Sequence, residues 1–155
     1  MAVLFVMCGI PGSGKSTWVQ NNLKRPFDKH ISRDEIRFSM IKEGENYFSK
    51  EDKVFDQFCT DITGALNKGF NVYADATHIN YGSRKKLLDR VANYADAVIA
   101  IEMPTPVSVA LERNEGRKDQ GLRYVPPSAI KRMYNQYESP DYDEGFDRIY
   151  TAIGD

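Results

Sequence analysis

A glycine-rich segment near the start of the chain limits the folds that this chain can adopt. Residues 2–8 form a short apolar run, and the letters GIPGSGKST follow at residues 9–17. This is the G-x-x-x-x-G-K-[ST] phosphate loop, flanked as it requires by strand-forming and helix-forming stretches. Gly9, Gly12 and Gly14 allow backbone N–H groups to turn toward a phosphate chain without Cβ clashes. The segment therefore predicts binding of a nucleoside triphosphate.

Two side chains of this loop have defined chemistry. Lys15 can reach the β- and γ-phosphates, and the Ser16 hydroxyl is suited to bind Mg²⁺. The helix that begins here points its positive N-terminus at the same phosphates. The residues predicted to bind the nucleotide are Gly9, Gly12, Ser13, Gly14, Lys15, Ser16 and Thr17.

Composition narrows the class of protein. The 155 residues suit one domain, and the net charge of −1 gives no overall attraction to nucleic acid. Cys8 and Cys59 lie in apolar stretches and are expected to be buried thiols of a reducing compartment. No stretch reaches the roughly 20 apolar residues of a membrane span, and we expect no signal peptide, since the first apolar run leads straight into the phosphate loop. We expect a soluble cytoplasmic enzyme with no membrane contact.

Strand and helix signals alternate along the chain. Strands are expected at residues 2–8, 30–32, 70–74, 97–103 and 147–153. Helices are expected at 15–23, from a cap at Ser32 or Asp34 to 42, from a cap at Ser49 to 69, at 82–94, at 106–113 and from 126 or 127. The pattern predicts an α/β fold with a parallel sheet covered on both faces and with ligands beyond the carboxyl ends of its strands.

The segment after the second expected strand fits an acceptor site. Asp34 and Arg37 are three residues apart, so a helix places them on one face. A kinase needs a carboxylate beside the acceptor hydroxyl and a cation for the acceptor's own phosphate. Asp34 and Arg37 are candidates for these roles, although a solvated helix start is the alternative. Arg33 and Glu35 are expected to be structural.

Asp75 follows the third expected strand, next to the predicted Mg²⁺ position. It could hold the metal through a water, as a Walker B carboxylate does. Alternatively, it orients Ser16 or a basic acceptor-site side chain, or serves only as a turn residue. His78 is expected to be a loop contact and His30 an ordinary strand residue.

A basic segment at residues 114–125, here called the lid segment, is suited to cover the triphosphate. An arginine on the γ-phosphate supplies about 10³–10⁵ in rate in related chemistry. Arg117 is the preferred candidate, Arg113 and Arg123 are further nucleotide-binding candidates, and Lys118 is expected to be solvated.

Taken together, these motifs resemble the kinase domain of phage-type polynucleotide 5′-kinases, within a P-loop kinase group that includes zeta-toxin-like kinases. The residues that carry the resemblance are 9–17, 32–37, 75–80, 112–117, 125–126, 137–140 and 143–147. It implies a P-loop kinase-like three-layer sandwich with strand order 2-3-1-4-5, as a single domain over residues 1–155. It also implies ATP and Mg²⁺ on Lys15 and Ser16, the acceptor 5′-hydroxyl on Asp34, the acceptor phosphate on Arg37 and Arg117 in the lid.

The sequence thus predicts an ATP-dependent kinase of the 5′-hydroxyl of a DNA or RNA end. A kinase of a small-molecule hydroxyl, such as a nucleoside, sugar or nucleotide-sugar, is the first alternative, and a nucleotide-binding switch is the second. No obligate protein partner is evident. Local cations would have to contact the polynucleotide, and the candidates beside the lid arginines are Arg33, Arg37, Arg84, Lys85 and Lys86.

Overall fold

The computed structural model describes residues 1–119 and 124–152. Its centre is a parallel sheet of five strands in the order β2-β3-β1-β4-β5, which confirms the expected topology. The strands are β1 (Val3–Cys8), β2 (Asp28–Ser32), β3 (Asn71–Asp75), β4 (Ala97–Glu102) and β5 (Arg148–Thr151).

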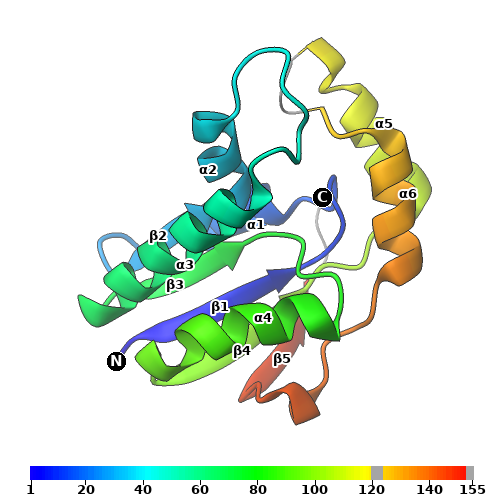
Figure 1. Cartoon of the computed structure of the whole chain (residues 1–155). Helices are drawn as coiled ribbons and strands as arrows, with labels where there is room; N and C mark the ends of the chain where they lie inside the picture. Colours follow the sequence, from blue (N-terminus) through cyan, green and yellow to red (C-terminus); the bar gives the residue numbers. More distant parts are fainter. Residues whose placement is uncertain (120–123, 153–155) are drawn as a thin grey trace.

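Helices cover both faces of this sheet. They are α1 (Lys15–Asn22), α2 (Arg33–Met40), α3 (Glu51–Asn67), α4 (Tyr81–Val91), α5 (Val107–Glu115) and α6 (Pro127–Gln136), with short 3₁₀ turns at η1 (Ala92–Tyr94) and η3 (Tyr142–Glu144). Helices α3 and α4 lie on one face, while α5 and α6 lie beyond the carboxyl ends of the central strands (Figure 1). The same edge holds the phosphate loop, so the topology gathers the functional segments there.

The two faces of β1 belong to different layers of the core. Leu4 and Val6 are fully buried in the cluster that contains the apolar faces of α3 and α4. Met7, between them and the loop, is buried in a second cluster with Val19 of α1. This alternation follows from the two-residue period of a strand, and it fixes the strand end from which the phosphate loop starts.

Several expected element boundaries are wrong. Ser32 caps α2 by accepting the Glu35 N–H at 3.2 Å, but Ser49 does not cap α3, which begins after Lys50 without a side-chain cap. Helix α5 extends to Glu115, so Asn114 is helical and buried rather than part of a charged loop. Its amide exchanges two hydrogen bonds with the backbone of Val125, at 2.9 and 2.6 Å.

The cysteines and the lengths of the helices bear on expectations drawn from composition. Cys8 and Cys59 are buried free thiols, as predicted. Within the described ranges, no helix combines the length and apolar character needed to cross a bilayer.

Candidate active site

The phosphate loop has the backbone that its glycines predict. Gly12 and Gly14 have φ angles of +85° and +90°, which residues with a side chain rarely adopt. A Cβ on Gly12 would also lie 2.7 Å from the carbonyl oxygen of Ala110, so the loop packs directly against α5. Gly14 immediately precedes the first residue of α1, so the loop leads straight into the helix N-terminus, where backbone N–H groups favour an anion.

Lys15 folds back into this loop. Its Nζ donates to the carbonyl oxygens of Gly9 at 2.9 Å and Ile10 at 3.0 Å, and to Ser13 Oγ at 3.3 Å. Burial lowers the pKa of Lys15 from its ordinary value, against the nearby charge of Asp75. The ammonium is therefore held where a phosphate chain would provide its missing counter-charge.

Asp75 connects the loop to an unexpected histidine. Its Oδ2 accepts from Ser16 Oγ at 2.6 Å and from His30 Nε2 at 2.7 Å, and His30 Nδ1 lies 2.7 Å from Gln20 Nε2. Burial would raise the pKa of Asp75, but the His30 hydrogen bond and the Lys15 charge outweigh it and keep that pKa low. The expectation that His30 is an ordinary strand residue is therefore wrong, since His30 holds the Asp75 carboxylate in place.

The residues at this point fit Mg²⁺ bound together with a nucleotide. Ser16 and Asp75 offer a hydroxyl and a carboxylate, the hard oxygen donors that Mg²⁺ prefers. Within the described part of the chain, no three His, Cys, Asp or Glu side chains gather into a cage for a metal. Mg²⁺ needs no such cage, since it usually keeps waters and phosphate oxygens as ligands.

Arg37 is held in place by carboxylates on the acceptor side of the pocket. Its Nε and Nη2 donate to the two oxygens of Glu51, at 2.7 and 2.6 Å. Its Nη1 donates to Asp34 Oδ1 and, at 3.2 Å, to the Tyr47 hydroxyl. Burial disfavours the charge, but the Glu51 hydrogen bonds raise the pKa of Arg37 above its ordinary value. The guanidinium is thus permanently charged and mostly engaged, which sequence reasoning did not anticipate.

Asp34 has one engaged and one open carboxylate oxygen. Oδ1 accepts from the Tyr47 hydroxyl at 2.9 Å as well as from Arg37. Oδ2 has no hydrogen-bond partner among the described residues, and the side chain is 52% exposed. Burial and the Asp34 charge raise the pKa of Tyr47, so its hydroxyl stays a donor. The open oxygen is therefore available to an incoming hydroxyl group.

An arginine of α5, just before the lid segment, contacts the phosphate loop. Arg113 Nη1 donates to the carbonyl oxygen of Gly12 at 3.0 Å. Arg117 lines the same pocket as Lys15, whereas Arg123 lies outside the described residues. Lys118 pairs with an exposed glutamate one turn earlier, as its expected solvated role predicts.

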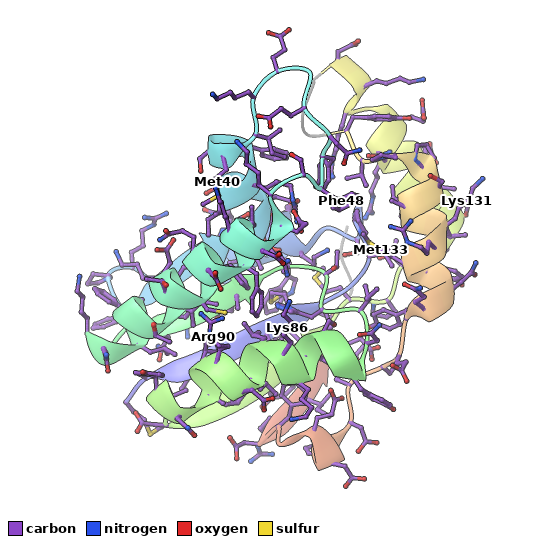
Figure 2. All side chains as sticks on the ribbon, viewed as in Figure 1. Met40, Phe48, Lys86, Arg90, Lys131 and Met133 are labelled. Atoms are coloured by element: carbon purple, nitrogen blue, oxygen red, sulfur yellow. The ribbon has the colours of Figure 1, made fainter. Side chains whose placement is uncertain are left out.

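One pocket of about 200 Å³ brings most of these residues together. The predicted residues that line it are Gly12, Gly14, Lys15, Ser16, Thr17, Asp34, Arg37, Asp75 and Arg117. Gly9 and Ser13 are not among its lining residues, and Ser13 is fully buried. Phe48, between α2 and α3, and Met133 of α6 also line it from different elements (Figure 2).

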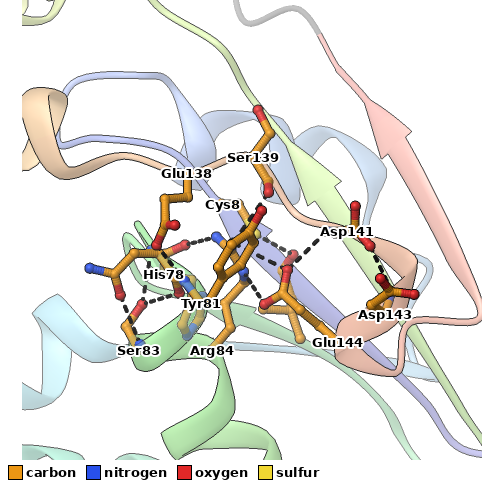
Figure 3. Close-up of polar contacts among 12 residues, drawn as sticks. Cys8, His78, Tyr81, Ser83, Arg84, Glu138, Ser139, Asp141, Asp143 and Glu144 are labelled. Atoms are coloured by element: carbon orange, nitrogen blue, oxygen red, sulfur yellow. Dashed lines mark hydrogen bonds and ion pairs between the residues drawn. The ribbon is translucent and has the colours of Figure 1, made fainter.

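Arg84 was predicted as a surface cation, and this prediction is wrong. The side chain is fully buried and donates to both Glu144 oxygens, at 2.8 and 3.2 Å, and to the His78 carbonyl oxygen at 2.8 Å (Figure 3). His78 contacts the Met7 carbonyl oxygen through Nδ1 at 2.6 Å, and burial lowers its pKa to about 4. A neutral His78 and a buried Arg84 support the sheet end beneath the loop.

Comparisons with known proteins show what this chain is similar to. The family model described as an AAA domain matches residues 4–140. The L-seryl-tRNA(Sec) kinase of Methanococcus maripaludis is 27% identical over 89% of this chain and 53% of its own length. A "Putative bifunctional polynucleotide phosphatase/kinase" of Acanthamoeba polyphaga mimivirus is 33% identical over 96% of this chain and 32% of its own. The chain thus spans about half or less of these relatives.

A solved structure shares the fold. Chaetomium thermophilum Kti12 in complex with ADP-AlF3 superposes with a TM-score of 0.71 and 18% identity, over 98% of this chain and 89% of Kti12. At this identity the likeness concerns the fold alone.

Proposed function

We propose that this chain, which belongs to the AAA domain family whose model matches residues 4–140, is an ATP-dependent kinase of polynucleotide 5′-hydroxyl ends. One observation carries the proposal: Lys15 of the phosphate loop and the open carboxylate of Asp34 line one pocket. A donor phosphate and an acceptor hydroxyl would then meet between them. We assign this activity to a single domain over residues 1–155.

Each side chain has a proposed role in the transfer. The loop N–H groups and Lys15 hold the β- and γ-phosphates, and Arg117 stabilises charge on the transferred group. Mg²⁺, when held by Ser16 and Asp75, supplies further neutralisation of the phosphates. Because phosphoryl transfer has a loose transition state, Asp34 orients the acceptor hydroxyl as much as it accepts its proton.

The polynucleotide acceptor is supported by the motifs and by the mimivirus relative, which is named as a polynucleotide phosphatase/kinase. Arg37 would meet the acceptor's phosphate with the one N–H that Glu51, Asp34 and Tyr47 leave open, since a guanidinium has five donors. A kinase of another hydroxyl compound is the second candidate, favoured by the likeness to L-seryl-tRNA(Sec) kinase.

A transfer assay with labelled γ-phosphate separates these candidates. Parallel reactions contain 5′-hydroxyl oligonucleotides, a nucleoside, a sugar and seryl-tRNA, each with ATP and Mg²⁺. We expect the highest kcat/KM with the oligonucleotides. Labelling of the sugar, nucleoside or seryl-tRNA, without labelling of the oligonucleotides, would replace the polynucleotide assignment by the second candidate.

Asp34→Asn should lower kcat by about 10²-fold or more and leave the Kd for ATP nearly unchanged, because the lost charge faces the acceptor. Steady-state kinetics and nucleotide titration measure the two effects. Glu35→Gln is the matched control, since Glu35 is exposed and lines a different pocket. Equal losses in the two variants, or a weakened ATP complex in Asp34→Asn, would remove Asp34 from the acceptor role.

A further inference from the structure

Three cations surround one aromatic ring between α3 and α4. The Phe55 ring has Lys86 Nζ at 4.5 Å, and the guanidinium carbons of Arg33 at 5.3 Å and Arg90 at 5.6 Å, from its centroid. Phe55 itself is 5% exposed, so the cations lie along the surface that covers it. Lys86 and Arg90 lie on the side of α4 that faces α3 (Figure 2). Covering a ring requires apolar side-chain stems, but not three positive charges.

The charges of this cluster are incompletely neutralised. Arg33 shares Glu51 with Arg37, and Arg90 contacts an exposed aspartate, Asp56, at 3.1 Å. Lys86 forms no ion pair with any described residue. Its neighbour Lys85, by contrast, pairs with an aspartate one turn later on α4 at 2.9 Å. An exposed pair such as that of Arg90 contributes little and exchanges readily for another anion.

The cluster is continuous with the active-site pocket. Arg33 lines that pocket beside Asp34, and its guanidinium also lies over Phe55. Lys86 and Arg90 are four residues apart, so they share one face of α4. Arg90 lies farther than Lys86 from the sheet edge that holds the pocket (Figure 2). The cluster therefore extends from the acceptor side of the pocket, at Arg33, to the surface between α3 and α4, at Lys86 and Arg90.

We propose that this cluster binds the phosphates of the acceptor strand beyond its 5′-terminal nucleotide, with Lys86 and Arg90 as the contacts. The inference rests on the proposed function, and it specifies a single-stranded polynucleotide as the occupant. Each phosphate bound by a cation releases counterions, so binding by this cluster depends on the salt concentration. Few contacts are available, so the gain from a longer acceptor ends after a few nucleotides.

The test compares Lys86→Gln and Arg90→Gln with Lys85→Gln, which makes the same charge change as Lys86→Gln on the adjacent residue. Transfer is measured with a nucleoside 3′-phosphate and with a decanucleotide over a range of salt concentrations. We expect KM for the decanucleotide to rise about 3- to 10-fold in the first two variants, with the slope of log binding constant against log salt reduced by about 0.7 per lost contact. KM for the nucleoside 3′-phosphate should not change, and Lys85→Gln should behave as the parent.

A binding measurement separates this proposal from the proposed function. Fluorescence anisotropy of a labelled single strand is recorded with the parent and all three variants, and thermal midpoints verify their folding. Binding that depends on Lys86 and Arg90 supports the cluster as the site for the strand, even if the oligonucleotide is not phosphorylated. Equal affinity in all four proteins, or an equal loss of affinity in Lys85→Gln, overturns the proposal that Lys86 and Arg90 bind the strand. Absence of binding by the parent overturns it as well.

Discussion

Lys15→Met is expected to reduce kcat/KM by at least about 10²–10³-fold while leaving the protein folded. The variant keeps most of the apolar stem and removes the loop's ammonium charge, which is placed to follow the β- and γ-phosphates through the transfer. The effect should exceed that of Asp34→Asn, because stabilisation of phosphate charge matters more than proton removal in a loose transition state. Transfer assays with a saturating oligonucleotide acceptor measure the loss.

Folding of the Lys15 variant follows from what the ammonium contacts. Burial disfavours the charge of the Lys15 ammonium, and among the described residues this group donates only to oxygens of the phosphate loop. Removing it therefore costs little stability, and the thermal midpoint should stay near that of the parent. Lys24→Met, at an exposed lysine beyond α1, controls for loss of a positive charge. Turnover within a few-fold of the parent would contradict the assignment of Lys15 to the phosphates.

The fold could be predicted because its signals are local. The phosphate loop fixes a strand, a turn and a helix within about twenty residues, and the alternation of apolar runs predicts a parallel sheet. The strand order came from the family resemblance, and the structure confirms it. Asp34 and Asp75 could be placed near the loop because β2 and β3 end at the same edge of the sheet.

The supporting residues of the site could not be predicted, because their partners are distant in sequence. His30 and Asp75 are 45 residues apart, and Arg37 and Glu51 are 14 apart on different helices. No periodicity links such pairs, since each contact depends on how two elements pack. Tyr47 lies in the connection between α2 and α3, where sequence gives no regular pattern.

Two errors had a signal that was overlooked. Arg84 is three residues before Leu87 and seven before Val91, so it shares the buried face of α4. Asn114 is four residues after Ala110, on the buried side of α5. In both cases a polar residue type was taken to be exposed although the helical period places it inside.

Glu144→Gln is expected to lower the free energy of unfolding by about 3–5 kcal/mol, because it leaves the buried Arg84 charge without its carboxylate. Arg84 is fully buried and Glu144 is 13% exposed, so little solvent screens the pair. In the parent, burial opposes the charge, but the Glu144 hydrogen bonds raise the pKa of Arg84. Without them Arg84 still stays charged at neutral pH, because a guanidinium keeps its proton in proteins. For a chain of this size the thermal midpoint should fall by about 6–20 °C.

Asp143→Asn is the matched control, since Asp143 lies exposed in the same 3₁₀ turn and should change stability by less than about 0.5 kcal/mol. The double variant Arg84→Met with Glu144→Met removes both charges, and we expect it to unfold at a higher denaturant concentration than Glu144→Gln alone. Such non-additivity identifies the buried charge, rather than a disturbed turn, as the cause. Parental stability in Glu144→Gln would mean that water reaches Arg84, and that the segment between α6 and β5 is held to the sheet by its backbone contacts instead.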